Sequence, residues 1–153
     1  MAKAMRQTRN IPLRIVQLLI VVTFAGRCAP ADINGSEIKI VVNPSVRISQ
    51  ISRDELERIF LMTKTSLAGG DHVEPVLEKN GHANEVFLRE YIGRTEAALM
   101  TYYRSLVFTG KASVPKSFSS DEAVIDYVAR TKGAIGYVSA NAGMGGVKAL
   151  KVQ

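Results

Sequence analysis

The sequence has few of the residues on which most catalytic and metal sites depend. Its 153 residues include one cysteine, two histidines and no tryptophan. A single cysteine excludes an internal disulfide framework and a cysteine-based zinc site, and His72 and His82 have no cysteine near them. The sequence also lacks a GxSxG elbow, a GxxxxGK(S/T) phosphate loop and a dinucleotide fingerprint. It therefore predicts no enzyme, no catalytic residue, no metal site and no cofactor.

Acidic residues are absent from the first thirty-one positions, and this changes the meaning of the net charge of +6. Five of the twenty Lys and Arg residues lie in this segment, so the rest of the chain has fifteen basic and fourteen acidic residues. That remainder has no basic block and no basic residues interleaved with aromatic ones. The sequence therefore predicts no binding to nucleic acid.

The N-terminal segment also lacks an apolar run long enough to cross a bilayer. The run LLIVVTFAG, 18–26, has nine residues, whereas a membrane-spanning helix needs about twenty. A basic start, a short apolar run and the small residues Ala29 and Ala31 are typical of a secretory signal that is cleaved after Ala31. We therefore expect residues 1–31 to be a signal peptide.

The mature part, 32–153, is then expected in the periplasm or outside the cell. Two alternatives stay open at this point. One is a permanent membrane anchor, and the other is a lipoprotein attached through Cys28, although Arg27 directly before the cysteine fits a lipobox poorly.

The mature part alternates short apolar runs with patterns of helical period, which predicts an α/β sandwich of about 120 residues. Strands are expected at 38–42, 72–77, 134–139 and 147–152. Helices are expected after the caps Ser52, Thr95 and Ser119, and over the apolar positions 83–91. We expect 111–118 to be a surface connection, and the glycine-rich segment 140–146 to be a hairpin-like turn between the last two strands.

One loop between a predicted strand and a predicted helix, Lys79-Asn80-Gly81-His82, has the form of an anion site. In such a loop the exposed amide N–H groups and the positive end of the helix point the same way. The surrounding stretch has no serine or threonine to add a hydroxyl donor, and it contains Glu78. The architecture therefore favours an anion, and the side chains do not.

Three segments in order resemble the type 2 periplasmic binding proteins, and most nearly the phosphate-binding proteins of ABC importers. They are VVNPSVRISQISRDELERIFLMTKTSL (41–67), VEPVLEKNGHANEVF (73–87) and VIDYVARTKGAIGYVS (124–139). The resemblance extends from Ile38 to about Val152. It implies a single lobe of a type 2 periplasmic-binding-protein-like fold, in which a central sheet is flanked by helices. The family has two lobes with the ligand between them, and this chain has room for one.

The resemblance also implies the position of a ligand site. The family's GSGT falls on Asn80, Gly81, His82 and Ala83, and with Asn84 these residues are the candidate ligands of phosphate or another oxyanion. The positions of the family's two hydroxyl groups are Gly81 and Ala83 here. The family's upstream arginine falls near Glu78, which exchanges a cation for an anion.

The resemblance implies an exported solute-binding protein of the phosphate-importer type. It is expected to bind phosphate or a similar oxyanion weakly, or as part of a homodimer. The permease of an ABC importer or another envelope protein is its expected partner. An alternative stays open: a protein-interaction module outside transport that keeps the lobe and has lost the ligand site.

Overall fold

The computed structural model describes residues 37–67, 69–79 and 81–153, all within one unit, Asn34–Gln153. The expected signal peptide, its alternatives and Asn80 of the candidate site lie outside the described residues. The described part forms a six-stranded sheet with the strand order β2-β6-β1-β5-β3-β4. The strands are β1 (Ile38–Val42), β2 (Gln50–Ile51), β3 (Glu74–Glu78), β4 (Lys116–Phe118), β5 (Ala134–Ser139) and β6 (Lys148–Val152).

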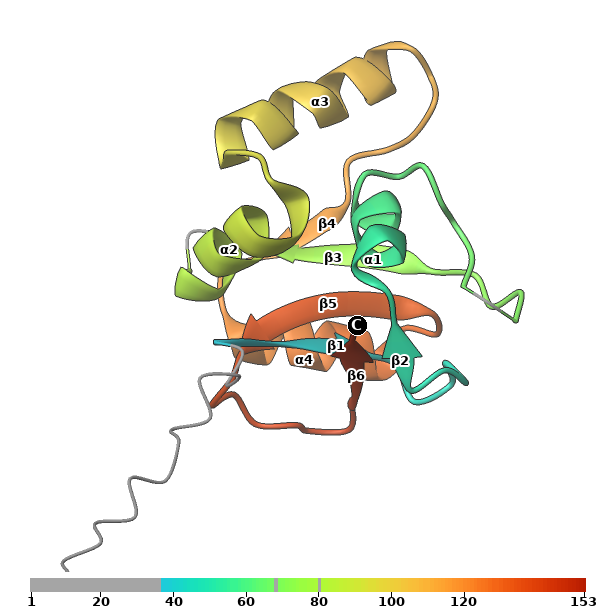
Figure 1. Cartoon of the computed structure of the whole chain (residues 1–153), viewed down its shortest axis with the longest axis vertical. Coiled ribbons are helices and arrows are strands. Elements are labelled where there is room, and N and C mark those ends of the chain that lie inside the picture. The colour runs from blue at the N-terminus through green and yellow to red at the C-terminus, as the bar shows by residue number, and fades with distance from the viewer. Residues whose placement is uncertain (1–36, 68, 80) are drawn as a thin grey trace, which may run out of the picture. The chain divides into compact units, whose positions relative to one another are not determined.

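The sheet is mixed, because β1 runs against both of its neighbours. It pairs antiparallel with β5, from Ile38 opposite Ser139 to Val42 opposite Ile135, and antiparallel with β6. The other pairs, β2 with β6, β3 with β5 and β3 with β4, are parallel. As in other sheets with parallel strands, helices cover both faces (Figure 1).

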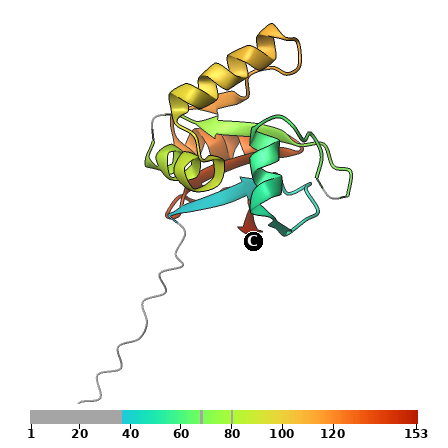
Figure 2. The same ribbon diagram turned by 45° about the horizontal axis from the view of Figure 1, so that its top comes forward.

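The helices are α1 (Arg53–Phe60), α2 (His82–Phe87), α3 (Glu96–Phe108) and α4 (Asp121–Arg130), and α2 continues into a π-helical turn, Leu88–Ile92. Helix α4 lies on one face of the sheet, and α1 and α2 lie on the other (Figures 1 and 2). Strand β5 serves both faces, since alternate side chains of a strand point to opposite sides. Val138 packs in the cluster with α4, whereas Tyr137 packs in the cluster with α1 and α2.

Serine and threonine side chains fix the starts of three helices. Ser52 accepts a hydrogen bond from the Glu55 N–H at the start of α1, and Thr95 accepts one from Ala98 at the start of α3. These two caps confirm the sequence prediction. In α1 the side chain of Glu55 binds Lys64 rather than closing a capping box. Each such cap stabilises a helix by about 1 kcal/mol.

The asparagine of the VNP segment connects the sheet to α4. Asn43 is buried, and its Nδ2 donates to the backbone oxygens of Val128 and Ala129 at 2.8 and 2.9 Å. Its Oδ1 accepts from the Ser45 N–H at 2.9 Å. One side chain thus binds free carbonyls in the last turn of α4 and shapes the chain after β1.

Three sequence predictions are wrong in detail. Part of the expected surface connection is a strand, because β4 adds a parallel edge to β3. The segment 140–146 is not a hairpin turn, since β1 lies between β5 and β6 in the sheet. The cap of α4 is Ser120 rather than Ser119, because the Ser120 Oγ accepts from the Ala123 N–H. Within the described residues, no helix has the length and apolar character needed to cross a bilayer.

Candidate functional site

The candidate loop lies where β3 ends and α2 begins, on the side of the sheet that carries α1 and α2. The backbone N–H of Lys79 donates to the Phe118 oxygen at 2.7 Å, which ties the loop to β4. Helix α2 begins after Gly81, whose extended backbone carries no side chain to cap the helix. Residue 81 thus supplies no cap of the kind found at α1, α3 and α4, and the Glu78 carboxyl lies over the start of α2 instead, where the Asn84 N–H acts on it.

The described candidate residues differ in where their side chains lie. His82 is exposed, and its Nε2 lies 3.3 Å from Glu37 Oε2. Ala83 is buried in the main core cluster and presents nothing to solvent. Asn84 is also buried, and its Oδ1 accepts a hydrogen bond from the Tyr137 hydroxyl at 2.8 Å. These side chains do not converge on one point, so a ligand at this loop meets mainly backbone amides.

Tyr137 of β5 holds the two ends of the loop together, and the sequence did not indicate this role. Its hydroxyl accepts from the Glu78 N–H at 3.2 Å and lies 2.8 Å from Asn84 Oδ1, so it joins β3 to α2. Its ring stacks on Phe87, with centroids 3.9 Å apart and planes 9° apart. Burial raises the pKa of Tyr137 far above its ordinary value, so the hydroxyl keeps its proton. The one signal in the sequence is a polar aromatic residue in the middle of an apolar strand.

Glu78 is the most unusual residue of the site. The residue is 6% exposed, and its Oε2 is the one buried side-chain atom without a hydrogen-bond partner among the described residues. Burial raises the pKa of the Glu78 carboxyl above its ordinary value, and the nearby Asp121 carboxylate raises it further. The backbone N–H of Asn84 and the His82 side chain act in the opposite direction. An ionised Glu78 is therefore costly here.

The basic side chains of the site lie on its exposed side and already contact an acidic residue. Arg89 Nη2 lies 3.7 Å from the same Glu37 oxygen that His82 contacts. The side chains of all three residues are more than half exposed. Ion pairs of this kind contribute little to stability because water screens them. An incoming oxyanion can therefore compete with Glu37 for these two side chains at small cost.

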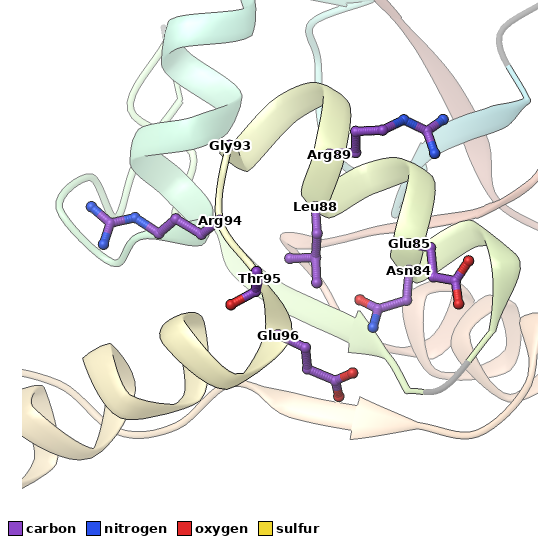
Figure 3. Close-up of a pocket in the computed structure, with 8 residues that line it drawn as sticks. All are labelled: Asn84, Glu85, Leu88, Arg89, Gly93, Arg94, Thr95 and Glu96. Atoms are coloured by element: carbon purple, nitrogen blue, oxygen red, sulfur yellow. The ribbon is translucent and has the colours of Figure 1, made fainter.

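A pocket of about 530 Å³ opens beside the loop, between the α2 segment and the start of α3 (Figure 3). Its lining residues are Asn84, Glu85, Leu88, Arg89, Gly93, Arg94, Thr95 and Glu96. Of the four candidate ligand residues that the structure describes, Asn84 alone contributes to it. The side chains of Arg89 and Arg94 point to opposite sides in Figure 3, so they do not form a cationic clamp. No group of three or more metal-ligating side chains occurs among the residues that the structure describes.

Comparison with known proteins identifies the fold. No protein-family model and no curated protein sequence matches the chain. Solved structures do match, each over 76% of this chain. They are a phosphate ABC transporter substrate-binding protein with bound phosphate from Clostridium perfringens (TM-score 0.61, 16% identity), PstS from Borrelia burgdorferi (0.58, 15%) and an ABC-type phosphate transport receptor from Vibrio cholerae (0.51, 16%).

The chain has the fold of these phosphate-binding receptors, which confirms the resemblance and the fold class predicted from the sequence. It matches 44% of the length of the Clostridium protein, 47% of the Borrelia protein and 46% of the Vibrio protein. The chain thus spans less than half of each of these structures. At 15–16% identity the likeness concerns the fold, and the ligand and the role are separate questions.

Proposed function

We propose that the chain is an exported solute-binding protein of the phosphate-importer type, which binds phosphate or a similar oxyanion weakly at the loop of residues 80–84. The observation that carries the proposal is the fold it shares with phosphate-binding receptors. The loop places the first amides of α2, which residue 81 does not cap, beside His82 and Arg89. Such a helix start attracts an anion.

Weak affinity follows from what the loop lacks. A helix end contributes about 0.3–1 kcal/mol to holding a nearby anion, and each hydrogen bond with a charged group about 1.5–3 kcal/mol. Glycine and alanine at positions 81 and 83 supply no hydroxyl donor, and Glu78 supplies a negative charge. Together these changes cost about 5 kcal/mol, which weakens a micromolar site to the millimolar range.

We propose that the domain is exported and acts with a second protein chain. Residues 1–31 are proposed as the signal peptide and 32–153 as the domain that acts in the periplasm or outside the cell. A second chain completes the ligand site. In a homodimer the 80–84 loops of the two copies face each other across one cleft, and otherwise an importer permease supplies the second half. We propose no enzymatic role. No observation on the described residues favours the alternative of a protein-interaction module.

Calorimetric titration of residues 32–153 with phosphate tests the proposal, with sulfate as the comparison and light scattering to measure the oligomeric state. We expect millimolar phosphate binding by a monomer, or tighter binding by a dimer. If phosphate gives no heat of binding at concentrations up to several millimolar, at neutral and at acidic pH, the proposed function is contradicted.

The placement of the ligand has its own test. A bulky residue at Gly81 collides with the Glu78 carboxyl and obstructs the approach to the first amides of α2, since even a Cβ there lies 1.9 Å from Glu78 Oε1. The variant Gly81→Leu is therefore expected to abolish phosphate binding. Unchanged affinity in this variant, checked by the same titration, places the ligand elsewhere.

A further inference from the structure

The Glu78 carboxyl group lies over the start of α2. A Cβ atom built on Gly81 falls 1.9 Å from Glu78 Oε1 and 2.9 Å from Oε2, distances at which atoms overlap. The glycine thus leaves room for a carboxyl group rather than for solvent. The carboxyl group therefore lies beside the first amides of α2, which the proposed ligand must reach.

The polar groups around this carboxyl include no Lys or Arg side chain. The Tyr137 hydroxyl of β5 contacts the Glu78 backbone, not its side chain. Asp121, at the start of α4, repels the ionised form, whereas the Asn84 N–H favours it. The His82 side chain of α2 also favours the ionised form, but its Nε2 lies 3.3 Å from Glu37.

The remaining charges packed near the site do not reach the group. Lys116 of β4 is bound to Tyr127 and to Glu74, which lies at the opposite end of β3 from Glu78. Glu96 of α3 adds a further negative charge that acts on Tyr137. Among the described residues, the groups at the start of α2 oppose the charge of the Glu78 carboxylate, and burial outweighs them.

An oxyanion and an ionised Glu78 exclude each other at this position, because two like charges in a water-poor site repel strongly. A protonated carboxyl group is neutral and offers an O–H donor to an oxyanion. We propose that oxyanion binding at this loop is coupled to the uptake of one proton from solvent by Glu78. The inference rests on the proposed function and specifies how that site is regulated.

The consequence is a defined pH dependence. Where Glu78 is protonated in the free protein, binding takes up no proton and the affinity does not depend on this residue's charge. At higher pH each bound oxyanion brings one proton with it, and the affinity falls about tenfold for each pH unit. By reciprocity, bound phosphate raises the pKa of Glu78.

The test compares phosphate affinity in the wild type, in Glu78→Gln and in Glu122→Gln from about pH 5 to about pH 8. Glutamine keeps the shape of Glu78 and stays neutral. Glu122 is exposed in the first turn of α4, so its variant controls for the removal of one nearby charge. Phosphate itself titrates in this range, but the ratio of the wild-type Kd to the Glu78→Gln Kd cancels that change.

We expect this ratio to approach one at low pH and to rise about tenfold per pH unit above the pKa of Glu78, while Glu122→Gln follows the wild type. Carbon-13 NMR of the Glu78 carboxyl group is expected to show a higher pKa with phosphate than without it. A ratio that does not change with pH, or a pKa that phosphate leaves unchanged, overturns the coupling while the proposed function stands. If none of the three proteins binds phosphate at any pH, the proposed function fails, and the coupling fails with it.

Discussion

At the scale of single residues, the end of β3 and the start of α2 combine a carboxyl group with one unpaired oxygen and a tyrosine hydroxyl with several partners. Glu78 is buried with its Oε2 unpaired, whereas the hydroxyl of Tyr137 contacts both Glu78 and Asn84. Buried polar atoms are nearly always hydrogen-bonded. The unpaired carboxylate oxygen therefore lowers the stability of the folded state, and other interactions of the fold offset this loss. Such a group supports the functional role that we propose for this loop.

The charge of Glu78 is expected to destabilise the folded state at neutral pH. Its pKa is raised above the ordinary value of 4.5, so the folded chain binds this proton more tightly than the unfolded chain does. With Glu78 protonated, the folded state keeps its full stability below pH 4.5. It loses part of this stability as the pH rises through the folded-state pKa and the carboxyl group ionises. The variant Glu78→Gln should therefore raise the free energy of unfolding at neutral pH by about 1–3 kcal/mol.

Denaturant unfolding at neutral pH and near pH 4 measures this effect, and the gain should shrink at the lower pH. Glu122→Gln, an exposed change of the same kind, should shift stability by less than about 0.5 kcal/mol. A Glu78→Gln variant that is less stable than the wild type at neutral pH contradicts the assignment of a costly buried charge.

The hydroxyl of Tyr137 is expected to contribute more to the free energy of unfolding than the hydroxyl of Tyr102. Tyr137→Phe keeps the ring stacked on Phe87 and removes the acceptor of the buried Glu78 N–H and the donor to Asn84. A loss of about 1–3 kcal/mol is expected from thermal or denaturant unfolding. Tyr102→Phe is the control, because its hydroxyl makes one half-buried bond to the Leu61 oxygen. Equal losses in the two variants argue against a special role for Tyr137.

At the scale of elements, the helix starts give the sharpest comparison. Ser119 and Ser120 are adjacent, but Ser120 alone of the two accepts the Ala123 N–H. Ser120→Ala is expected to lower the free energy of unfolding by about 1 kcal/mol, whereas Ser119→Ala, at an exposed position, should have little effect. Unfolding curves of the two variants decide the assignment, and a larger loss for Ser119→Ala reverses it.

Local patterns predicted the elements whose cause is local. The Ser52 cap and the apolar positions Leu56, Ile59 and Phe60 define α1, and all three of these apolar residues are buried. The apolar run at 38–42 is β1 with the same bounds. Strand β4 escaped prediction because three residues carry no period, and its existence depends on pairing with β3, forty residues earlier in the chain.

Non-local pairing also explains the two remaining surprises. A glycine-rich segment between two strands reads as a hairpin, but β1 occupies the position between β5 and β6. The burial of Glu78 was equally hidden, because it results from α2 and α4 closing over the end of β3. The sequence located the loop and its glutamate, and the fold determines that the glutamate lies over Gly81.

At the scale of the whole molecule, the chain combines the fold of phosphate-binding receptors with less than half of their length. The proposed affinity is what the loop provides by itself. The loop offers backbone amides, the solvated side chains of His82 and Arg89, and a carboxyl group that opposes anions. We propose that this loop still binds an oxyanion, weakly and under the control of Glu78.

The most direct test of that claim follows the backbone amide signals of the nitrogen-15-labelled protein by NMR as phosphate is added. We expect the amide signals of Gly81, His82, Ala83 and Asn84 to shift together, to saturate in the millimolar range and to shift more strongly at acidic than at neutral pH. The pocket between the α2 segment and α3 should shift less. Amides at 81–84 that do not move at any pH, or shifts centred on another part of the sheet, would contradict the account.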